Sequence, residues 1–98
     1  MNLSNQPSDE AILEELGERL ARHRLDLNRT QAQLADAAGV AKRTIERLEA
    51  GKATQFANLI RVLRALGLGS RLDLLIPPAI AKPIEGLDLR GKRRQRAS

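Results

Sequence analysis

The feature that most constrains this chain is a pair of short helix-forming stretches, Gln31–Ala38 and about Ala41–Ala50, joined by a turn around Gly39. Thr30 followed by Gln33 has the spacing of a capping box, which starts the first stretch. Gly39 ends it, because only glycine adopts a left-handed backbone conformation cheaply. Two helices joined by so short a turn form a helix-turn-helix arrangement.

The apolar residues of this unit indicate which side of each helix is buried. Leu34 faces inward from the first helix, and Ala35 is small enough to let the second helix approach closely. Val40, Ile45 and Leu48 bury the inner side of the second helix. Its outer side then carries Lys42, Arg43, Glu46 and Arg47.

A helix held in this way can enter the major groove of DNA with its first residues against the base edges. Lysine and arginine can donate hydrogen bonds to the acceptors O6 and N7 of guanine. Thr44 can contact a phosphate or a thymine methyl group. The spacing alone is also compatible with an ordinary helical hairpin whose charged face meets only solvent.

Helical patterns flank this unit on both sides. We expect a first helix over about Asp9–Leu25, capped by Ser8 and ending near Asn28, with Leu13, Leu16, Leu20 and Leu27 near helical spacing.

A fourth helix is expected to open at Thr54 or Gln55 and to end at Gly67. Its expected buried face consists of Phe56, Leu59, Ile60, Leu63 and Leu66. Ser70 is expected to cap a short fifth helix, Arg71–Leu75, which Pro77 and Pro78 terminate.

These patterns predict an all-α protein with one domain over residues 8–77. Residues 1–7 are expected to be disordered, and residues 78–98 to form a proline-containing linker and a basic tail. The tails are expected to be disordered or to become ordered against a partner.

The net charge of +5 comes from the end of the chain. Residues 1–89 contain 12 basic and 12 acidic side chains and are neutral as a whole. Within them, residues 42–64 carry six bases against two acids, which suits a surface that faces phosphate. The excess lies in Arg90, Lys92, Arg93, Arg94 and Arg96, for which nonspecific phosphate contacts are one expectation.

The sequence offers no pattern for catalysis, for a metal or for another cofactor. The chain has no cysteine, so disulfides and thiolate sites are excluded. His23 has no partners at metal-ligand spacing, and Glu14 and Glu18 are expected to be solvated. No stretch is apolar enough to cross a bilayer, and no signal peptide is visible, so a cytoplasmic location is expected.

The run TQAQLADAAGVAKRTIERLEAGK, from Thr30 to Lys52, resembles the helix-turn-helix of the Xre/Cro family, which includes the lambdoid phage repressors. With its flanking helices the resemblance covers roughly residues 15–75. It implies a five-helix, lambda-repressor-like domain that binds double-stranded DNA. The landmarks are Thr30-Gln31, Leu34-Ala35, Gly39-Val40, Thr44-Ile45, Leu48-Glu49 and Gly51-Lys52.

The resemblance also implies roles for individual residues. Gln31 corresponds to a glutamine that contacts phosphate while it braces the recognition helix, and Thr44 to a residue that contacts the DNA backbone. The resemblance implies that Lys42, Arg43 and Arg47 contact the bases. It implies that Lys52 and Thr54, in the following loop, contact phosphates.

Three further positions concern the stability of this unit. Arg24 and Glu49 match an ion pair that ties the first helix to the third. Arg29 stands where the family usually has an apolar residue, so its head group is expected to reach water. Ala41, at the start of the recognition helix and within the DNA-contacting set, replaces the usual Ser or Thr cap.

The end of the chain is similar to HipB-like antitoxins, which are encoded beside HipA-type kinase toxins, bind operators as dimers and repress their own operon. The segments that carry this likeness are RVLRALGL and GKRRQRA. It implies that Ile84, Leu87, Leu89 and the basic residues after them engage the toxin or a neighbouring subunit.

A homodimer on a palindromic operator is also expected on physical grounds, because specificity usually needs two half-sites roughly 34 Å apart. Leu72, Leu74, Leu75 and Ile76 are the apolar patch expected to pair, unless they only close the domain's own core. The alternatives are a stand-alone Xre-family repressor and a protein-interaction module without specific DNA binding.

Overall fold

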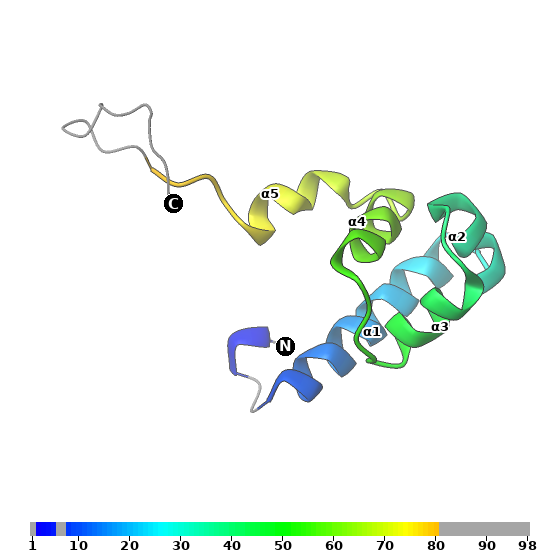
Figure 1. Cartoon of the computed structure of the whole chain (residues 1–98), viewed down its shortest axis with the longest axis horizontal. Helices are drawn as coiled ribbons and strands as arrows, with labels where there is room; N and C mark the ends of the chain where they lie inside the picture. Colours follow the sequence, from blue (N-terminus) through cyan, green and yellow to red (C-terminus); the bar gives the residue numbers. More distant parts are fainter. Residues whose placement is uncertain (1, 6–7, 81–98) are drawn as a thin grey trace.

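The structure, a computed structural model, describes residues 2–5 and 8–80, and its regular elements in this part of the chain are all helical (Figure 1). The predicted all-α fold is thereby confirmed. The elements are η1 (Leu3–Asn5), α1 (Asp9–Asp26), α2 (Gln31–Ala38), α3 (Lys42–Glu49), α4 (Phe56–Ala65), η2 (Gly69–Arg71) and α5 (Leu72–Leu75).

The first two α-helices begin at side-chain caps that the sequence predicts. The Ser8 hydroxyl accepts a hydrogen bond from the Ala11 backbone N–H at 3.1 Å. At α2 the Thr30 hydroxyl accepts from the Gln33 N–H at 3.0 Å, and the Gln33 side chain accepts from the Thr30 N–H at 2.9 Å. This capping box satisfies backbone donors that the first turn of a helix leaves without partners.

The helices α1 to α4 all end in the same hydrogen-bond pattern. At the end of α2, Gly39 has a φ of 73° and donates to Asp36 O at 3.3 Å, while the next N–H, of Val40, donates to Ala35 O at 3.0 Å. This is the Schellman motif, which needs a left-handed residue just beyond the helix. The corresponding left-handed residues of the other helices are Asn28, Gly51 and Gly67.

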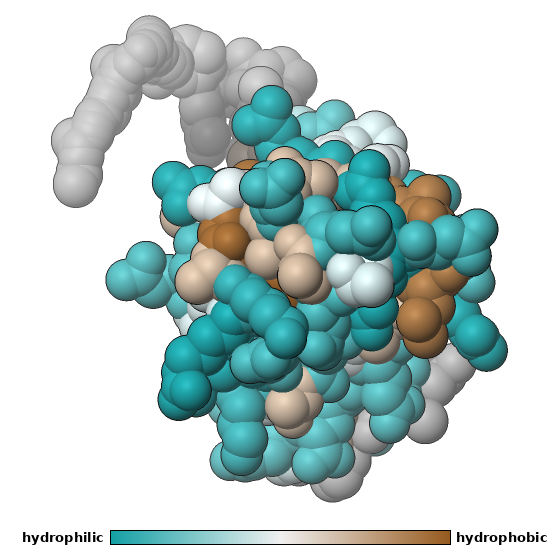
Figure 2. Space-filling model, turned by 90° about the vertical axis from the view of Figure 1, so that its right-hand side faces the viewer, coloured by the Kyte–Doolittle hydropathy of each residue, from teal (hydrophilic) through white to brown (hydrophobic). Residues whose placement is uncertain are grey.

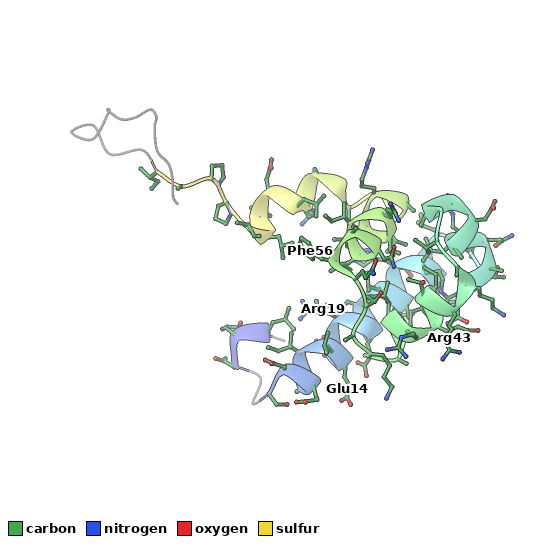
Figure 3. All side chains as sticks on the ribbon, viewed as in Figure 1. Glu14, Arg19, Arg43 and Phe56 are labelled. Carbon is green, nitrogen blue, oxygen red and sulfur yellow. The ribbon has the colours of Figure 1, made fainter. Side chains whose placement is uncertain are left out.

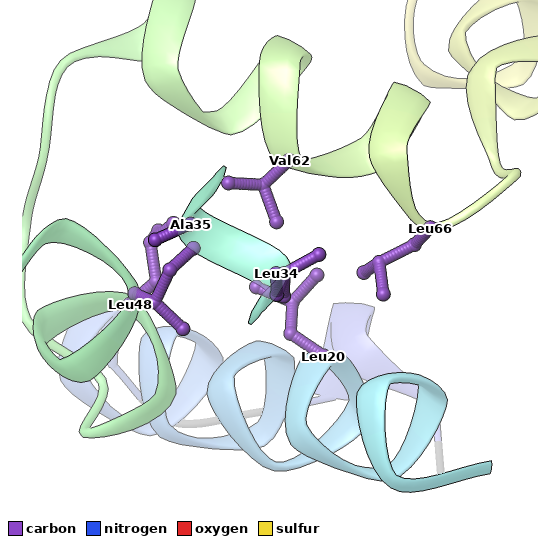
Figure 4. Packing of buried hydrophobic residues seen from close by; sticks show 7 residues of the cluster. Leu20, Leu34, Ala35, Leu48, Val62 and Leu66 are labelled. Atoms are coloured by element: carbon purple, nitrogen blue, oxygen red, sulfur yellow. The ribbon is translucent and has the colours of Figure 1, made fainter. Parts of the chain in front are cut away.

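The core is a small aliphatic cluster centred on α2 (Figure 4). Leu34 is fully buried, and it lies between Leu20 of α1 and the α4 residues Val62 and Leu66. From α3, Ile45 completes the most deeply buried set, with 1% of its surface exposed. The most deeply buried side chains of the described residues are all aliphatic, so burial of aliphatic surface is the main force that holds the helices together.

The crossing of α1 and α3 depends on a glycine inside α1. Gly17 is buried, and a Cβ at this position would lie 2.6 Å from the carbonyl oxygen of Leu48 and 2.7 Å from that of Glu49. The absence of a side chain therefore lets the end of α3 rest directly on α1. The sequence analysis did not single out this residue.

One of the expected buried positions is exposed. Phe56, placed on the buried face of α4, is 55% exposed. It lies in the first turn of that helix, where fewer neighbouring elements can cover a side chain. On α4 the deepest position is instead Val62, which shares a helix face with Leu59 and Leu66.

The Arg29 head group makes a contact within the protein that the sequence analysis did not predict. Its Nη1 donates to the carbonyl oxygen of Ala65 at 3.2 Å, at the last residue of α4. The four last carbonyls of a helix lack partners within it, so Arg29 satisfies one of them and complements the negative end of the helix dipole. Arg29 therefore has a hydrogen-bond acceptor for its charged group at a position where the family usually has an apolar residue.

Two further details differ at the ends of the domain. Residues 1–7 were expected to be disordered, whereas Leu3–Asn5 form one turn of 3-10 helix. Ser70 was expected to cap the fifth helix, but it lies within η2, and Arg71 precedes α5 without a side-chain cap. The expected basic tail, Arg90 to Arg96, and the apolar residues Ile84, Leu87 and Leu89 lie outside the described residues.

Candidate nucleic-acid interface

Helix α3 is anchored by one apolar side and presents the opposite side to solvent. Ile45 and Leu48 are buried against α1 and α2, with 1% and 8% exposure. Figure 2 views the end of the molecule where α2 and α3 lie, and hydrophilic side chains cover most of it. The exposed residues of α3 are Lys42, Arg43, Glu46 and Arg47.

The three predicted base-reading residues differ in how they are held. Arg43 extends away from the domain, and its side chain makes no hydrogen bond or ion pair within the described chain (Figure 3). Lys42 faces Glu46 with a 3.7 Å separation, and both side chains are about half exposed or more, so water screens the pair. Arg47 donates from Nη2 to the carbonyl oxygen of Ala53 at 3.0 Å.

This contact of Arg47 was not expected. It ties α3 to the loop before α4, so part of the guanidinium is already occupied in the free protein. An arginine carries five N–H donors, so the remaining ones can still face a ligand. The structure therefore gives Arg47 a second task, which is to hold the loop.

The start of α3 is weakly capped, in agreement with the sequence. Ala41 occupies the cap position with extended backbone angles and offers no side-chain hydrogen bond. Its carbonyl accepts from the Thr44 N–H at 2.9 Å, and the Thr44 side chain is half-buried. The N–H groups of Lys42 and Arg43 belong to the first turn, where a helix supplies no acceptor, and they lie beside the exposed basic side chains.

The loop after α3 differs from its expected role in one respect. The resemblance assigns phosphate contacts to Lys52 and Thr54 through N–H groups and side chains. The Lys52 N–H, however, donates to Arg47 O at 2.9 Å, where it closes the Schellman motif of α3. Lys52 can therefore contact phosphate only through its exposed ammonium group, whereas Thr54 is half-buried.

A polar network fixes the orientation of α3 against α1 and α2. The guanidinium of Arg24 donates to both carboxylate oxygens of Glu49, at 2.7 Å from Nε and 3.1 Å from Nη2. The amide of Gln31 donates to Glu49 Oε1 at 3.0 Å, and Arg24 also donates to Arg29 O at 2.8 Å. One carboxylate therefore joins three helices, as the resemblance implied for the pair and for the bracing glutamine.

The burial of this network makes it a structural feature. The side chains of Arg24 and Glu49 are only 12% and 9% exposed. The hydrogen bonds to Glu49, with the charge of its carboxylate, raise the pKa of Arg24 above its ordinary value, while desolvation acts in the opposite direction. The contact with Glu49 therefore favours the charged form of the Arg24 guanidinium. The sequence analysis implied a bracing role for Gln31 without naming Glu49 as its partner, and it did not anticipate the contact of Arg29 with Ala65.

Other candidate chemistries find no support in the described residues. His23 is exposed. Within residues 2–5 and 8–80, no group of three or more His, Asp or Glu side chains is placed to hold a metal ion. No helix in these same ranges has both the length and the apolar character needed to span a membrane.

Comparison with known proteins agrees with this geometry. The model of the helix-turn-helix family, of the Xre type, matches residues 20–72, from the middle of α1 to the start of α5. No curated protein is similar to the chain at a significant level. The match covers more than half of the chain and includes every residue of the α2–α3 unit. The chain therefore belongs to the Xre-type helix-turn-helix family of DNA-binding transcriptional regulators.

Proposed function

We propose that the chain is a repressor that binds a specific double-stranded operator through α3. The observation that carries this proposal is Arg43: it is exposed, unpaired within the described chain, and mounted on a helix that Glu49 fixes to α1 and α2. Base recognition requires donors held on a rigid support, since a loosely held side chain loses entropy on binding. Lys42 and Arg47 are proposed to read neighbouring bases, and Gln31, Ala41, Thr44, Lys52 and Thr54 to position the domain on the DNA backbone.

The test is a titration of the protein against duplexes from its own promoter region at fixed salt, with a random duplex as reference. Replacing Arg43 with alanine is expected to weaken operator binding by about 1–3 kcal/mol, that is, about 5- to 150-fold, and to relax specificity at one base pair. Arg22→Ala is a matched control, because Arg22 is an exposed arginine of α1 that lies beside Glu18 and Leu25 rather than on α3. It is expected to leave the affinity nearly unchanged.

Two results would contradict the proposal. If Arg43→Ala and Arg22→Ala weaken operator binding equally, α3 does not read the operator bases. If the promoter and random duplexes bind equally weakly, the alternative function is favoured, in which the basic face of α3 binds an acidic protein rather than DNA.

We further propose that the chain acts as a homodimer on a palindromic operator. The apolar patch for this contact is Leu72, Leu74, Leu75 and Ile76. Leu72 is half-buried, whereas Leu74 is 75%, Leu75 52% and Ile76 72% exposed. An exposed apolar run of this kind on a small domain favours pairing about a two-fold axis. Sedimentation equilibrium is expected to give the mass of two chains, and Ile76→Asp the mass of one. A wild-type chain that stays monomeric at the concentrations that saturate the operator would refute the dimer.

The finer proposal is that this regulator is an autorepressing antitoxin of a HipBA-like module, with a HipA-type kinase toxin as its partner and a cytoplasmic location. It rests on the resemblance of the fourth helix and the end of the chain to HipB-like antitoxins. The discriminating observation is the neighbouring gene. A HipA-type kinase gene there supports the antitoxin, and its absence favours a stand-alone Xre-family repressor.

A further inference from the structure

The first half of the loop between α3 and α4, residues 50–55, rests directly on α1. Gly51 has a φ of 77°, and a Cβ at this position would lie 2.9 Å from the Cα of Glu14. The loop therefore approaches the backbone of α1 without an intervening side chain. The Gly51 N–H also donates to Leu48 O at 3.1 Å, which ties the same point to α3.

The second half of the loop is held by a side chain. Arg47 donates from Nη2 to the carbonyl oxygen of Ala53 at 3.0 Å. Residues 52–55 have no regular secondary structure, and Gln55, at the cap position of α4, makes no side-chain hydrogen bond to that helix. The bond from Arg47 thus restrains a stretch that neither secondary structure nor a helix cap restrains.

Lys52 lies between these two points of attachment. Its N–H donates to Arg47 O at 2.9 Å, so its backbone is fixed to the same residue whose side chain holds Ala53. The Lys52 side chain is exposed and makes no hydrogen bond or ion pair within residues 2–5 and 8–80. Arg47 therefore determines, through its backbone and its side chain, the direction from which the Lys52 ammonium group projects.

A restrained loop changes the free energy of a phosphate contact. A lysine that neutralises a phosphate releases a condensed counterion, which favours binding to DNA of any sequence. A mobile loop loses conformational entropy when it binds, and this loss offsets part of the gain. A loop that is already held in the free protein loses less entropy, so its lysine contributes more to the affinity.

We propose that Arg47 is the positioning residue of the loop 50–55, and that the contribution of Lys52 to DNA affinity depends on the bond from Arg47 to Ala53. The proposal rests on the proposed contact of Lys52 with the DNA backbone. This role of Arg47 is separate from base contact, which uses the N–H groups that Ala53 does not occupy. Phosphate contacts strengthen binding to every duplex, whereas base contacts strengthen binding to the operator.

A double-mutant cycle between Arg47→Ala and Lys52→Ala, measured on a random duplex at fixed low salt, tests this proposal. A random duplex reports on the phosphate contacts, because it lacks the bases that the operator presents. With Arg47 present, we expect Lys52→Ala to weaken binding about three- to tenfold. In the Arg47→Ala background the same substitution should weaken binding less than about twofold, because the loop no longer holds Lys52 toward the DNA.

The control cycle combines Lys52→Ala with Arg43→Ala. Arg43 is exposed on α3 like Arg47, but its side chain makes no hydrogen bond within the described chain. Lys52→Ala is therefore expected to cost the same factor whether or not Arg43 is present. Far-UV circular dichroism verifies that each variant keeps its helical content.

A measurement without DNA gives a second test. Nitrogen-15 relaxation of the free protein should give backbone order parameters of about 0.85 for residues 53–55, and values falling toward about 0.6 in Arg47→Ala, while α3 stays rigid. Unchanged order parameters, or equal losses from Lys52→Ala with and without Arg47, would overturn the proposal and leave the phosphate contact of Lys52 standing. If Lys52→Ala binds random DNA as tightly as the unchanged protein, the phosphate contact itself is refuted, and the positioning role with it.

Discussion

Replacing Glu49 with alanine is expected to lower the free energy of unfolding by about 3–5 kcal/mol. The change leaves the buried guanidinium of Arg24 without its carboxylate, and it also removes the acceptor of Gln31. A loss of this size is a large part of the stability of a small domain, which is about 5–15 kcal/mol. Because the chain has no Trp or Tyr, urea unfolding followed by far-UV circular dichroism is the suitable measurement.

Glu46 provides a matched control on the same helix. Its carboxylate faces Lys42 at 3.7 Å, and its side chain is 48% exposed. Exposed helical pairs contribute only about 0.3–0.5 kcal/mol, so Glu46→Ala should change the stability little. Equal losses for Glu46→Ala and Glu49→Ala would show that the Glu49 network does not hold α3.

A double substitution separates the contribution of the Arg24–Glu49 ion pair to the free energy of unfolding from the loss that follows when only one partner is removed. Arg24→Met combined with Glu49→Leu replaces both charges by apolar side chains of similar size. We expect this double variant to be more stable than Glu49→Ala, because no buried charge is left alone. A double variant as unstable as the single one would mean that the ion pair itself stabilises the fold strongly.

Replacing Gly17 with alanine is expected to destabilise the domain by about 3 kcal/mol, at the upper end of the usual cost of overpacking. The new Cβ would lie 2.6 Å from the backbone oxygen of Leu48, and backbone cannot rotate aside as a side chain can. The expected loss exceeds the gain of about 1 kcal/mol that alanine brings to a helix interior. The same unfolding measurement applies.

Gly69→Ala is the control for this substitution. A Cβ there would lie 3.5 Å from the side chain of Arg64, which is ordinary van der Waals contact. Its effect is expected to stay within about 0.5 kcal/mol, as for most surface substitutions. If Gly17→Ala proves equally mild, α1 and α3 can separate without cost. Operator binding of Gly17→Ala should then also match that of the unchanged protein.

Much of this fold could be predicted because its helix boundaries depend on local interactions. The capping box joins Thr30 to Gln33, and the Schellman motif at Gly39 joins residues that are at most five positions apart. Such contacts form wherever the right residue types occur at the right spacing. The predicted bounds of α2 are therefore those of the structure, and the basic outer side of α3 follows from its buried Ile45 and Leu48.

Burial was harder to predict, because it depends on the extent of neighbouring helices. Phe56 continues the apolar pattern of α4, yet it is 55% exposed since it lies in the first turn of that helix. Val62 was not among the residues expected to be buried, and it is 1% exposed because α2 packs against that side of α4. Periodicity defines a helix face, but only the packing partner determines which residues of the face are covered.

The sequence by itself determined the α2–α3 unit from Thr30 to Lys52, including its turn at Gly39 and the three basic side chains on its outer side. Only the tertiary structure decided how that unit is held. Arg29 bonds to Ala65 across 36 residues, Gln31 reaches Glu49, and Gly17 receives the end of α3. These contacts exist only when the helices have packed, since each joins atoms that no local spacing brings together.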